Sequence, residues 1–383
     1  MTEIVLRGIT WQHRRAVDPL EASLAAFRRQ RPDIEISWEA RPLSGFEFQP
    51  VEELAAAYDL IVFDHPHVGE IARIASLAPL DELAAAHPDD AFVGASLDSY
   101  RYEGRLWAVP LDAACQTAVH RPDQLARCGG EVPRSWAETL FLGEQAARQG
   151  LRLAIALAGV HSLMTFFSLC ANLRPPVGGP TDAGFLDRDK AGMALEALRR
   201  LVALSAPEVL DWNSIALQDA MTRRDDLVFC PAVYGFATYA EPDNAHRLAY
   251  TDFTGLREPF FAGSTLGGAG LGISASCRHL EAAKSYADFL AGPRAQLAFT
   301  LHHGQPARRD AWEDAGVNER FHGFYRDTRA TIESAWVRPR HAGYLHFQRA
   351  AGELVERHLR GDAPEDELLA KLSRLYEQTG GTR

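Results

Sequence analysis

The first part of the chain alternates short apolar runs with stretches of helical spacing. Residues 3–7 predict a strand, and Asp18 and Pro19 then open a helix, because Asp caps free N–H groups and Pro suits a first turn. Residues 34–40 alternate apolar and polar side chains, which predicts a half-buried strand. Residues 59–63 end in four apolar residues, which is typical of a fully buried parallel strand. This order implies a right-handed crossover in a parallel sheet.

The rest of the chain continues this mixture of helices and strands. Residues 104–112 predict an extended segment, the Gly-rich stretch 263–273 returns to strand character, and the tail after Tyr344 is mostly helical. From the apolar spacing we expect helices at 51–57, 136–148, 162–172, 191–204 and 279–291, and strands at 152–156 and 226–234. The pattern predicts an α/β protein without internal repeats.

Composition and charge exclude several classes of protein. The chain has 383 residues, of which 46% are hydrophobic, and this is enough for two compact lobes. A formal net charge of −11 without any basic block argues against nucleic acid as a partner. No run approaches the roughly 20 apolar residues of a membrane helix, so we expect no membrane insertion. The N-terminus also lacks the apolar core and cleavage site of a signal peptide.

Sequence motifs give no support for catalysis, a cofactor or a metal. The chain has no GxSxG, HExxH, P-loop or Rossmann fingerprint. Its five cysteines lack CxxC spacing, and an odd number cannot all pair within one chain, so we expect buried or half-buried free thiols. Cys115 with His120 offers a weak nucleophile–base alternative. An inert buried cysteine is the preferred interpretation.

Four ordered blocks resemble a known family. They are YDLIVFDHPHVGEIARIASLAPLD (58–81), GRLWAVPLDAACQTAVHRPDQLARCGGEVPRSWAE (104–138), the segment 267–306 with GGAGLGIS and EAAKSYADFL, and the helical tail with Arg360-Gly361. This set is similar to the family 1 extracellular solute-binding proteins of ABC importers, the class that includes maltose-binding protein. The chain departs from the family at Val119-His120-Arg121, where a Tyr-Asn pair is usual, and in lacking a secretion signal.

The resemblance implies a type II periplasmic-binding-protein-like fold, with two α/β lobes joined by a hinge and a ligand cleft between them. Lobe one would comprise residues 1–112 plus 262–306, and lobe two residues 113–261 plus 307–383. The chain would cross near 111–112, 261–263 and 304–308. Ligand closes such a cleft by hinge motion.

Polar and aromatic residues at predicted strand ends are the candidate ligand contacts in lobe one. Asp64 and His65 follow a buried strand, where ligands sit in open α/β sheets. His67 is a weaker candidate, and a metal site with these histidines would need a third ligand that the spacing does not supply. The alternative for Asp64 is a helix cap. Trp11, placed in a loop after the first strand, either stacks on a sugar ring or belongs to the core.

The other candidates lie near the predicted crossings and in lobe two. Asp112 follows a hinge proline and would accept hydrogen bonds from vicinal hydroxyls, or cap a turn. His161 precedes a predicted helix start at which Ser162 would be the N-cap, and Tyr234 ends an apolar strand. Gly267 and Gly268 would offer backbone N–H groups, or mark close packing.

These observations predict a binding protein rather than an enzyme. We expect a monomer that closes over a small polar ligand, a carbohydrate or polyol, for the transmembrane permease subunits of an ABC importer. The alternative is a cytoplasmic protein of the same fold that acts as a ligand sensor or as an enzyme of a catabolic cluster. The localisation is periplasmic if a signal peptide was removed, and cytoplasmic if Met1 is the native start.

Overall fold

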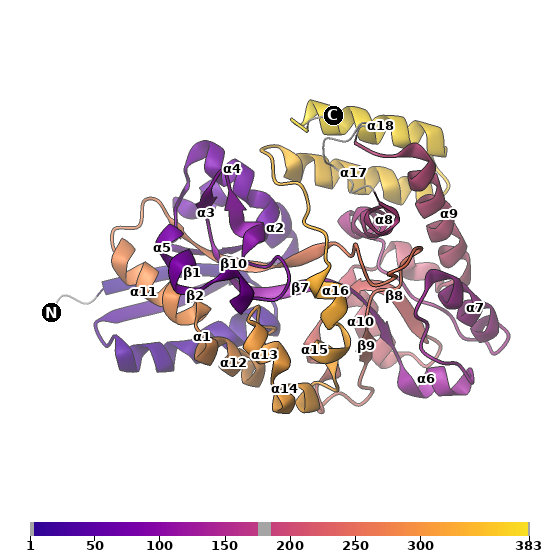
Figure 1. The fold of residues 1–383 in the computed structure, drawn as a ribbon, viewed down its shortest axis with the longest axis horizontal. Coiled ribbons are helices and arrows are strands. Elements are labelled where there is room, and N and C mark those ends of the chain that lie inside the picture. The colour runs from indigo at the N-terminus through magenta and orange to yellow at the C-terminus, as the bar shows by residue number, and fades with distance from the viewer. Residues whose placement is uncertain (1–3, 175–184, 382–383) are drawn as a thin grey trace. The chain divides into compact units, whose positions relative to one another are not determined.

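The computed structural model describes residues 4–174 and 185–381. Glu3, where the first strand was predicted to begin, lies outside the described residues. The chain divides into two compact units (Figure 1). Unit one comprises Met1–Ala114, Gly267–Val317 and Arg340–Leu345, and unit two comprises Cys115–Leu266, Asn318–Pro339 and His346–Arg383.

The strands of unit one come from two separate parts of the chain. Its strands are β1 (Ile4–Trp11), β2 (Ile34–Arg41), β3 (Leu60–Phe63), β4 (Leu77–Ala78), β5 (Arg101–Tyr102), β6 (Arg105–Leu106), the first half of β7 (Val109–His120) and nearly all of β10 (Leu266–Ser274). Its helices are α1 (Arg14–Gln30), α2 (Leu43–Phe48), α3 (Val51–Ala55), α4 (Val68–Ile74), α5 (Asp81–Ala86), α11 (Leu280–Ala291), α12 (Pro293–Phe299), α13 (Arg309–Glu313) and the first half of α14 (Ala315–Arg320), up to Val317. Short 3₁₀ turns are η1 (His65–His67), η2 (Asp89–Ala91), η3 (Asp98–Tyr100) and η6 (Thr300–His302).

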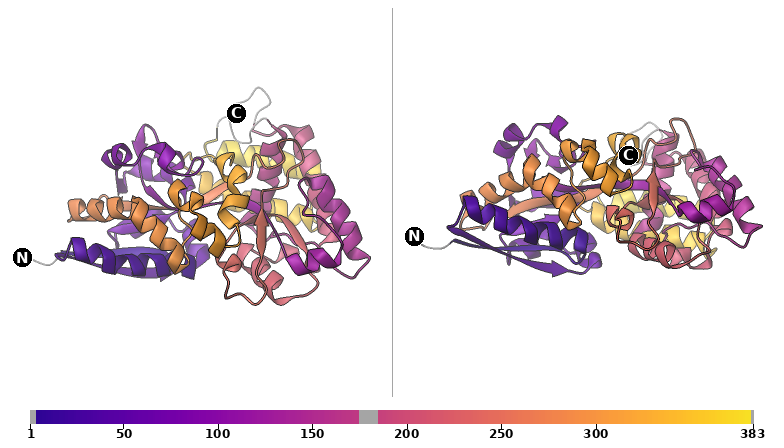
Figure 2. Two further views of the ribbon diagram at one scale, coloured as in Figure 1. Left: turned by 60° about the horizontal axis from the view of Figure 1, so that its bottom comes forward. Right: turned by 90° about the horizontal axis from the view of Figure 1, so that it is seen from below.

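The unit-one sheet has the order β2-β1-β3-β10-β7. β1 pairs in parallel with both β2 and β3, as the strand–helix–strand pattern predicted, while β10 runs antiparallel to β3. All four residues of β3 are buried, which confirms the fully buried strand. In Figures 1 and 2, α1, α11 and α12 gather along one side of this sheet. The parallel strands β1 and β3 therefore end at the same edge.

The start of α1 corrects a prediction. The helix begins at Arg14, and its N-cap is His13, whose Nδ1 accepts a hydrogen bond from the backbone N–H of Arg15 at 3.1 Å. Asp18 and Pro19 lie inside the helix, not at its beginning. Pro19 is the sixth residue of the helix, beyond the first turn, so its missing N–H removes one intrahelical hydrogen bond.

Unit two consists mainly of helices, which accompany the second half of β7. Its further strands are β8 (Phe229–Tyr234) and β9 (Ala249–Thr251), and both pair antiparallel with β7. Its helices are α6 (Pro122–Arg127), α7 (Trp136–Ala147), α8 (Val160–Leu173), α9 (Arg188–Leu204), α10 (Ser214–Arg223), α15 (Phe324–Asp327), α16 (Arg329–Glu333), α17 (Tyr344–Leu359), which starts in unit one, and α18 (Glu365–Gln378), with 3₁₀ turns η4 (Pro207–Leu210) and η5 (Ala237–Ala240).

Helix α8 is the core helix of unit two. Every residue from His161 to Leu173 is buried, so the helix is covered on all sides. Its N-cap is Gly159 and not Ser162, because the Ser162 hydroxyl donates to the carbonyls of Gly159 and Gly352 instead of capping a free N–H. The strand predicted at 152–156 is reduced to single bridges at Arg152 and Leu153.

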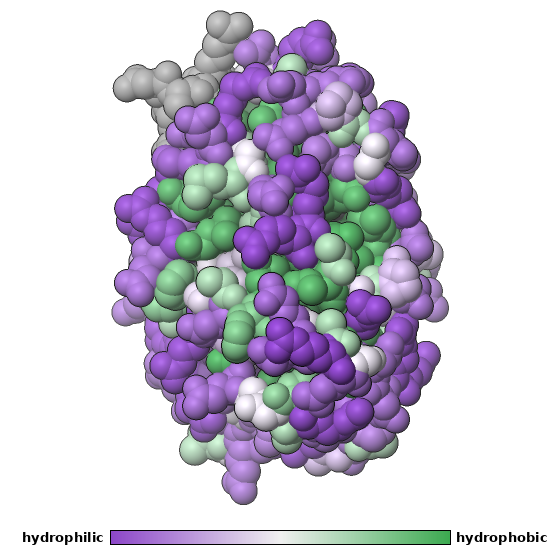
Figure 3. All heavy atoms as spheres, turned by 90° about the vertical axis from the view of Figure 1, so that its right-hand side faces the viewer, coloured by the Kyte–Doolittle hydropathy of each residue, from purple (hydrophilic) through white to green (hydrophobic). Residues whose placement is uncertain are grey.

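The surface of unit two carries few large apolar side chains. On the face shown in Figure 3, hydrophobic areas are interrupted by polar side chains. Phe141 of α7 is 62% exposed and Met193 of α9 is 57% exposed. Scattered residues of this kind are normal on a folded surface. Within the described chain, no helix is both long enough and apolar enough to cross a bilayer.

The chain leaves unit one at Ala114 and returns at Gly267, a few residues beyond the expected crossings near 112 and 262. The short segment Arg340–Leu345 also belongs to unit one, although the expected lobe two included it. The Arg340 guanidinium explains this placement, because it donates to the carbonyls of Asp98, Ser99 and Arg101.

Candidate functional site

Three candidate residues come together at one edge of the unit-one sheet. Trp11 is the last residue of β1 and not part of a loop, Asp64 follows β3 directly, and Asp112 lies in the first half of β7. The negative charge of Asp64 is close enough to raise the pKa of Asp112. Trp11 and Asp64 were expected from strand ends, whereas Asp112 was expected at a crossing and lies inside β7.

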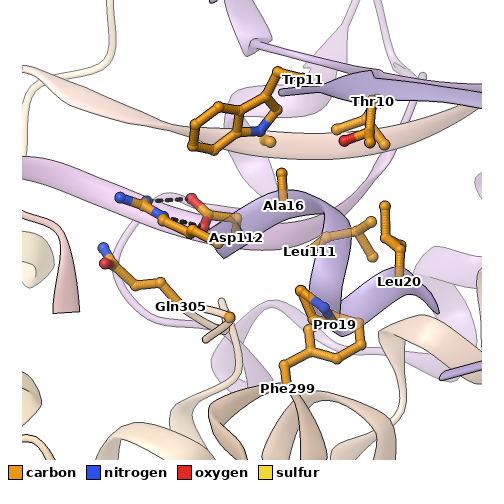
Figure 4. Close-up of a pocket in the computed structure, with 13 residues that line it drawn as sticks. Thr10, Trp11, Ala16, Pro19, Leu20, Leu111, Asp112, Phe299 and Gln305 are labelled. Carbon is orange, nitrogen blue, oxygen red and sulfur yellow. Dashed lines mark hydrogen bonds and ion pairs between the residues drawn. The ribbon is translucent and has the colours of Figure 1, made fainter. Parts of the chain in front are cut away.

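Asp112 is held by an arginine that the sequence analysis missed. Arg15 donates from Nε to Oδ2 at 2.6 Å and from Nη2 to Oδ1 at 2.5 Å, which is a bidentate pair (Figure 4). The side chains are 3% and 13% exposed. Burial raises the pKa of Asp112, while Arg15 acts in the opposite direction by favouring the carboxylate. The two formal charges compensate each other at this site.

Asp64 and His65 form a second local pair. The Asp64 carboxylate accepts a hydrogen bond from the backbone N–H of His65 at 2.8 Å, and the same oxygen lies 3.0 Å from Nδ1 of that histidine. Asp64 is thus the N-cap of η1, as its alternative interpretation proposed. His65 is 1% exposed and meets the Tyr100 ring edge-on, and His67 meets Phe63 in the same manner. Both histidines are therefore largely packed within unit one.

Trp11 belongs to an aromatic stack. Its ring lies 5.2 Å from that of His13 with an interplanar angle of 14°, and 5.7 Å from Phe46. The indole is 6% exposed. Burial, together with the positive charges of Arg15 and Arg14, lowers the pKa of His13 to about 4. The stack thus rests on a neutral imidazole at neutral pH, and the indole is largely buried.

A small pocket lies next to Trp11 inside unit one (Figure 4). Most of its wall is apolar, and the Arg15–Asp112 pair and Gln305 supply polar atoms. It is partly open to solvent, and the space that water centres can reach is about 20 Å³. The lining residues are Thr10, Trp11, Arg15, Ala16, Pro19, Leu20, Val62, Leu111, Asp112, Ala269, Phe299, Gly304 and Gln305.

Gly268 touches the same edge through its backbone. It has a φ of +125°, and a Cβ atom built there would lie 2.4 Å from the carbonyl oxygen of Asp112. Only glycine fits this conformation and this approach. The close-packing interpretation therefore explains Gly268, and the role of Gly267 and Gly268 as N–H donors to a ligand stays a prediction.

In unit two the structure brings His161 and Tyr234 together. Their ring centroids are 6.5 Å apart in an edge-on arrangement, and His161 Nδ1 lies 3.2 Å from the Ser214 hydroxyl. Burial lowers the pKa of His161 to about 4, so the imidazole is neutral at pH 7. His161 is the second residue of α8 and does not precede the helix.

Gln218 positions the strand end that carries Tyr234. Its amide donates to the carbonyls of Ser214 at 2.6 Å and Tyr234 at 3.2 Å, and its Oε1 accepts from the Phe236 N–H at 3.2 Å and the Tyr250 hydroxyl at 2.5 Å. Gln218 is fully buried. Sequence reasoning missed this residue, because three of its four partners, Tyr234, Phe236 and Tyr250, lie outside its own helix.

The cysteines and the acidic residues offer no further chemistry. None of the five cysteines forms a disulfide bond, and Cys115, Cys170 and Cys230 are buried, as expected from their odd number and scattered spacing. Burial raises the pKa of the Cys230 thiol to about 12, which makes it a poor nucleophile. In the ranges 4–174 and 185–381, His, Cys, Asp and Glu do not gather in groups of three that could hold a metal ion.

Comparison with known proteins identifies the fold. No protein-family model and no curated protein sequence matches the chain. Maltose-bound MalE3 of T. maritima matches with a TM-score of 0.83 and 19% identity over 98% of this chain and 99% of that chain. The ABC transporter solute-binding protein of Agrobacterium radiobacter K84 in complex with ribitol has a TM-score of 0.82 and 17% identity over 98% and 99% of the two chains.

A third structure agrees with these two. The ABC transporter solute-binding protein of Thermotoga lettingae TMO, bound with α-D-tagatose, has a TM-score of 0.83 and 15% identity over 99% of this chain and 100% of that chain. Together, the three matches confirm the type II periplasmic-binding-protein-like fold that the sequence blocks predicted. The fold is thus shared over the full length at low sequence identity.

Proposed function

We propose that this protein is the solute-binding protein of an ABC importer and that it binds a neutral polyhydroxylated molecule, a sugar or a polyol. The single observation that supports a neutral ligand is the bidentate pair between Arg15 and Asp112, in which the two buried charges offset each other. A charged ligand would have to compete with a partner that is already in place. A neutral hydroxyl can share the outer lone pairs of the carboxylate instead.

The proposal gives the aromatic residues the role of apolar contacts. Trp11 and Tyr234 would each contact C–H groups of the ligand, and Asp64 and His65 would bind hydroxyls. His161 would contribute as a neutral imidazole. Similar proteins hold maltose, ribitol and α-D-tagatose, which are all neutral and rich in hydroxyls.

Titration calorimetry with maltose, ribitol and D-tagatose tests this function. We expect at least one of the three to bind, and we expect gluconate and glucosamine, which carry a charge, to bind at least about tenfold more weakly. Exclusive binding of a charged compound would contradict the neutral-ligand proposal. A failure of all three neutral compounds would count against the carbohydrate assignment itself.

Two variants test the residue roles. Trp11→Ala and Tyr234→Ala should each weaken binding by about 1–3 kcal/mol, since each removes apolar contact area. The exposed Phe141→Ala change in α7 is a matched aromatic control that should leave affinity unchanged. If Trp11→Ala and Tyr234→Ala both bind like the parent protein, the two aromatic residues are not ligand contacts.

A further inference from the structure

Thr10 has a buried hydroxyl group without a hydrogen-bond partner among the described residues. Its side chain is 0% exposed and lines the pocket beside Trp11. Figure 4 shows the Thr10 side chain at the upper wall of this pocket, opposite Leu111 and Leu20. A buried hydroxyl that makes no hydrogen bond costs roughly 1–3 kcal/mol, so the pocket holds an unused polar contact.

The other walls of the pocket define what can enter. Carbon atoms of Ala16, Pro19, Leu20 and Phe299 line the side formed by α1 and α12, and these offer only apolar contacts. The Arg15–Asp112 pair is the nearest charged group, and its two members already bind each other. A charged group would lose its hydration here without gaining a counter-ion. The pocket therefore suits a small neutral group with one hydroxyl.

The size of the pocket narrows this choice. Its volume is about 20 Å³, and a polar cavity of about 10–15 Å³ is already enough to hold one water molecule. One or two non-hydrogen atoms fit, whereas a sugar ring does not. A carbon bonded to a hydroxyl oxygen matches both the volume and the polarity, with the carbon against the apolar wall and the oxygen at Thr10.

We infer that this pocket is a subsite for the terminal hydroxymethyl group of the ligand, and that the Thr10 hydroxyl hydrogen-bonds the hydroxyl of that group. The inference rests on the proposed function, because it assumes a sugar or polyol as ligand. On this inference, the Thr10 hydroxyl makes the protein bind ligands that end in CH₂OH more tightly than ligands that end in CH₃ or lack this carbon. The alternative is that a single ordered water molecule occupies the pocket and that the ligand does not enter it.

The test compares Thr10→Val with Thr10→Ser in calorimetric titrations with maltose, ribitol and D-tagatose. Valine keeps the shape of threonine and removes the hydroxyl, whereas serine keeps the hydroxyl. We expect Thr10→Val to weaken binding about five- to tenfold, the usual effect of one lost hydrogen bond, and Thr10→Ser to stay within about twofold of the parent protein.

A deoxy analogue makes the test specific. The pyranose form of D-tagatose has one hydroxymethyl group, and 1-deoxy-D-tagatose replaces it by a methyl group. If D-tagatose binds, the parent protein should prefer it about five- to tenfold over the analogue, and Thr10→Val should abolish most of this preference.

The possible failures are distinguishable. If the parent protein binds one of the three compounds and Thr10→Val binds it equally well, the pocket holds water only, and the inference is overturned while the proposed function stands. If a bound D-tagatose is not preferred over its deoxy analogue, the inference is overturned as well. If the parent protein binds none of the three compounds, the proposed function and the subsite both fall.

Discussion

Different interactions position the candidate ligand residues in the two units. In unit one, the edge of the sheet depends on charge, with Asp112 paired to Arg15 and Asp64 beside His65. In unit two, the end of β8 depends on neutral groups, because His161 is uncharged at pH 7 and the Gln218 amide makes four hydrogen bonds. A change of one residue should therefore have an electrostatic consequence in unit one and a hydrogen-bonding consequence in unit two.

The largest effect is expected when the charge pair of unit one is broken. Arg15→Met leaves the buried Asp112 carboxylate without its partner and should lower the free energy of unfolding by about 3–5 kcal/mol. Guanidinium denaturation monitored by circular dichroism measures this loss. The double variant Arg15→Met/Asp112→Leu should recover most of it, because no unpaired charge remains. A double variant as unstable as Arg15→Met alone would show that shape, and not charge, holds this edge together.

A smaller loss is expected in unit two when the amide is removed. Gln218→Leu removes the acceptor of the buried Phe236 N–H and one of the two acceptors of the Tyr250 hydroxyl. It should lower the free energy of unfolding by about 2–3 kcal/mol. The same denaturation experiment applies, with the exposed Gln149→Leu as a control that should change little. Equal stabilities of the two variants would mean that the Gln218 hydrogen bonds do not stabilise the strand end.

Acid should affect unit two through its buried histidine. The pKa of His161 is lowered by burial from 6.5 to about 4, so the unfolded chain binds more protons than the folded one between these values. Stability is therefore complete above about pH 6.5 and falls as the pH decreases towards 4, with a loss of about 1–2 kcal/mol per such histidine between pH 7 and pH 5.

Denaturation at a series of pH values checks this slope. His161→Gln should flatten it by the contribution of one histidine, whereas the exposed His346→Gln should leave it unchanged. His120 in unit two has a pKa lowered to about 4 by burial as well, so a residual slope should persist in His161→Gln. If the free energy of unfolding of His161→Gln depends on pH as steeply as that of the parent protein, His161 does not cause the loss of stability in acid.

The smallest effect is expected at Thr10 and has the opposite sign. Thr10→Val removes a buried hydroxyl without a described partner and should raise the free energy of unfolding by about 0.5–1 kcal/mol. Thr265 in unit two is a matched control, because it is equally buried but its hydroxyl donates to the Met164 carbonyl and contacts the Ser168 hydroxyl. Thr265→Val should destabilise by about 1 kcal/mol. If Thr10→Val and Thr265→Val change the free energy of unfolding in the same direction, the expected difference between the two hydroxyl groups is wrong.

The sequence predicted most elements whose signal is local. The four apolar residues of β3 and the alternation of β2 were sufficient to locate both strands. The start of α1 was misplaced because Asp18-Pro19 has the composition of a helix start, whereas the observed cap is His13, a residue that caps less often. Local rules rank the usual caps and cannot detect an unusual one.

The candidate site was predictable only at strand ends and at the predicted crossing. Asp64 follows β3 directly, so the strand-end rule was enough to single it out. Asp112 was singled out because it follows a proline at the predicted crossing, and it lies inside β7, which β10 separates from β3 in the sheet. Arg15 was missed because its partner is 97 positions away, and nothing in the neighbouring residues signals a buried ion pair. Thr10 was missed for a related reason, since an unused hydroxyl is visible only when its surroundings are known.

The position of β10 in the sheet has a consequence for the order in which the chain is made. This strand lies between β3 and β7, yet ribosomes synthesise it only after most of unit two. Until then, β3 and β7 have no neighbour on the facing sides, and such unpaired edges invite wrong pairing. Unit two in turn needs residues up to α18. A nascent chain of this protein therefore completes unit one only when residues up to Leu345 have emerged, and unit two only when α18 has emerged. A truncation before Arg340 should impair both units.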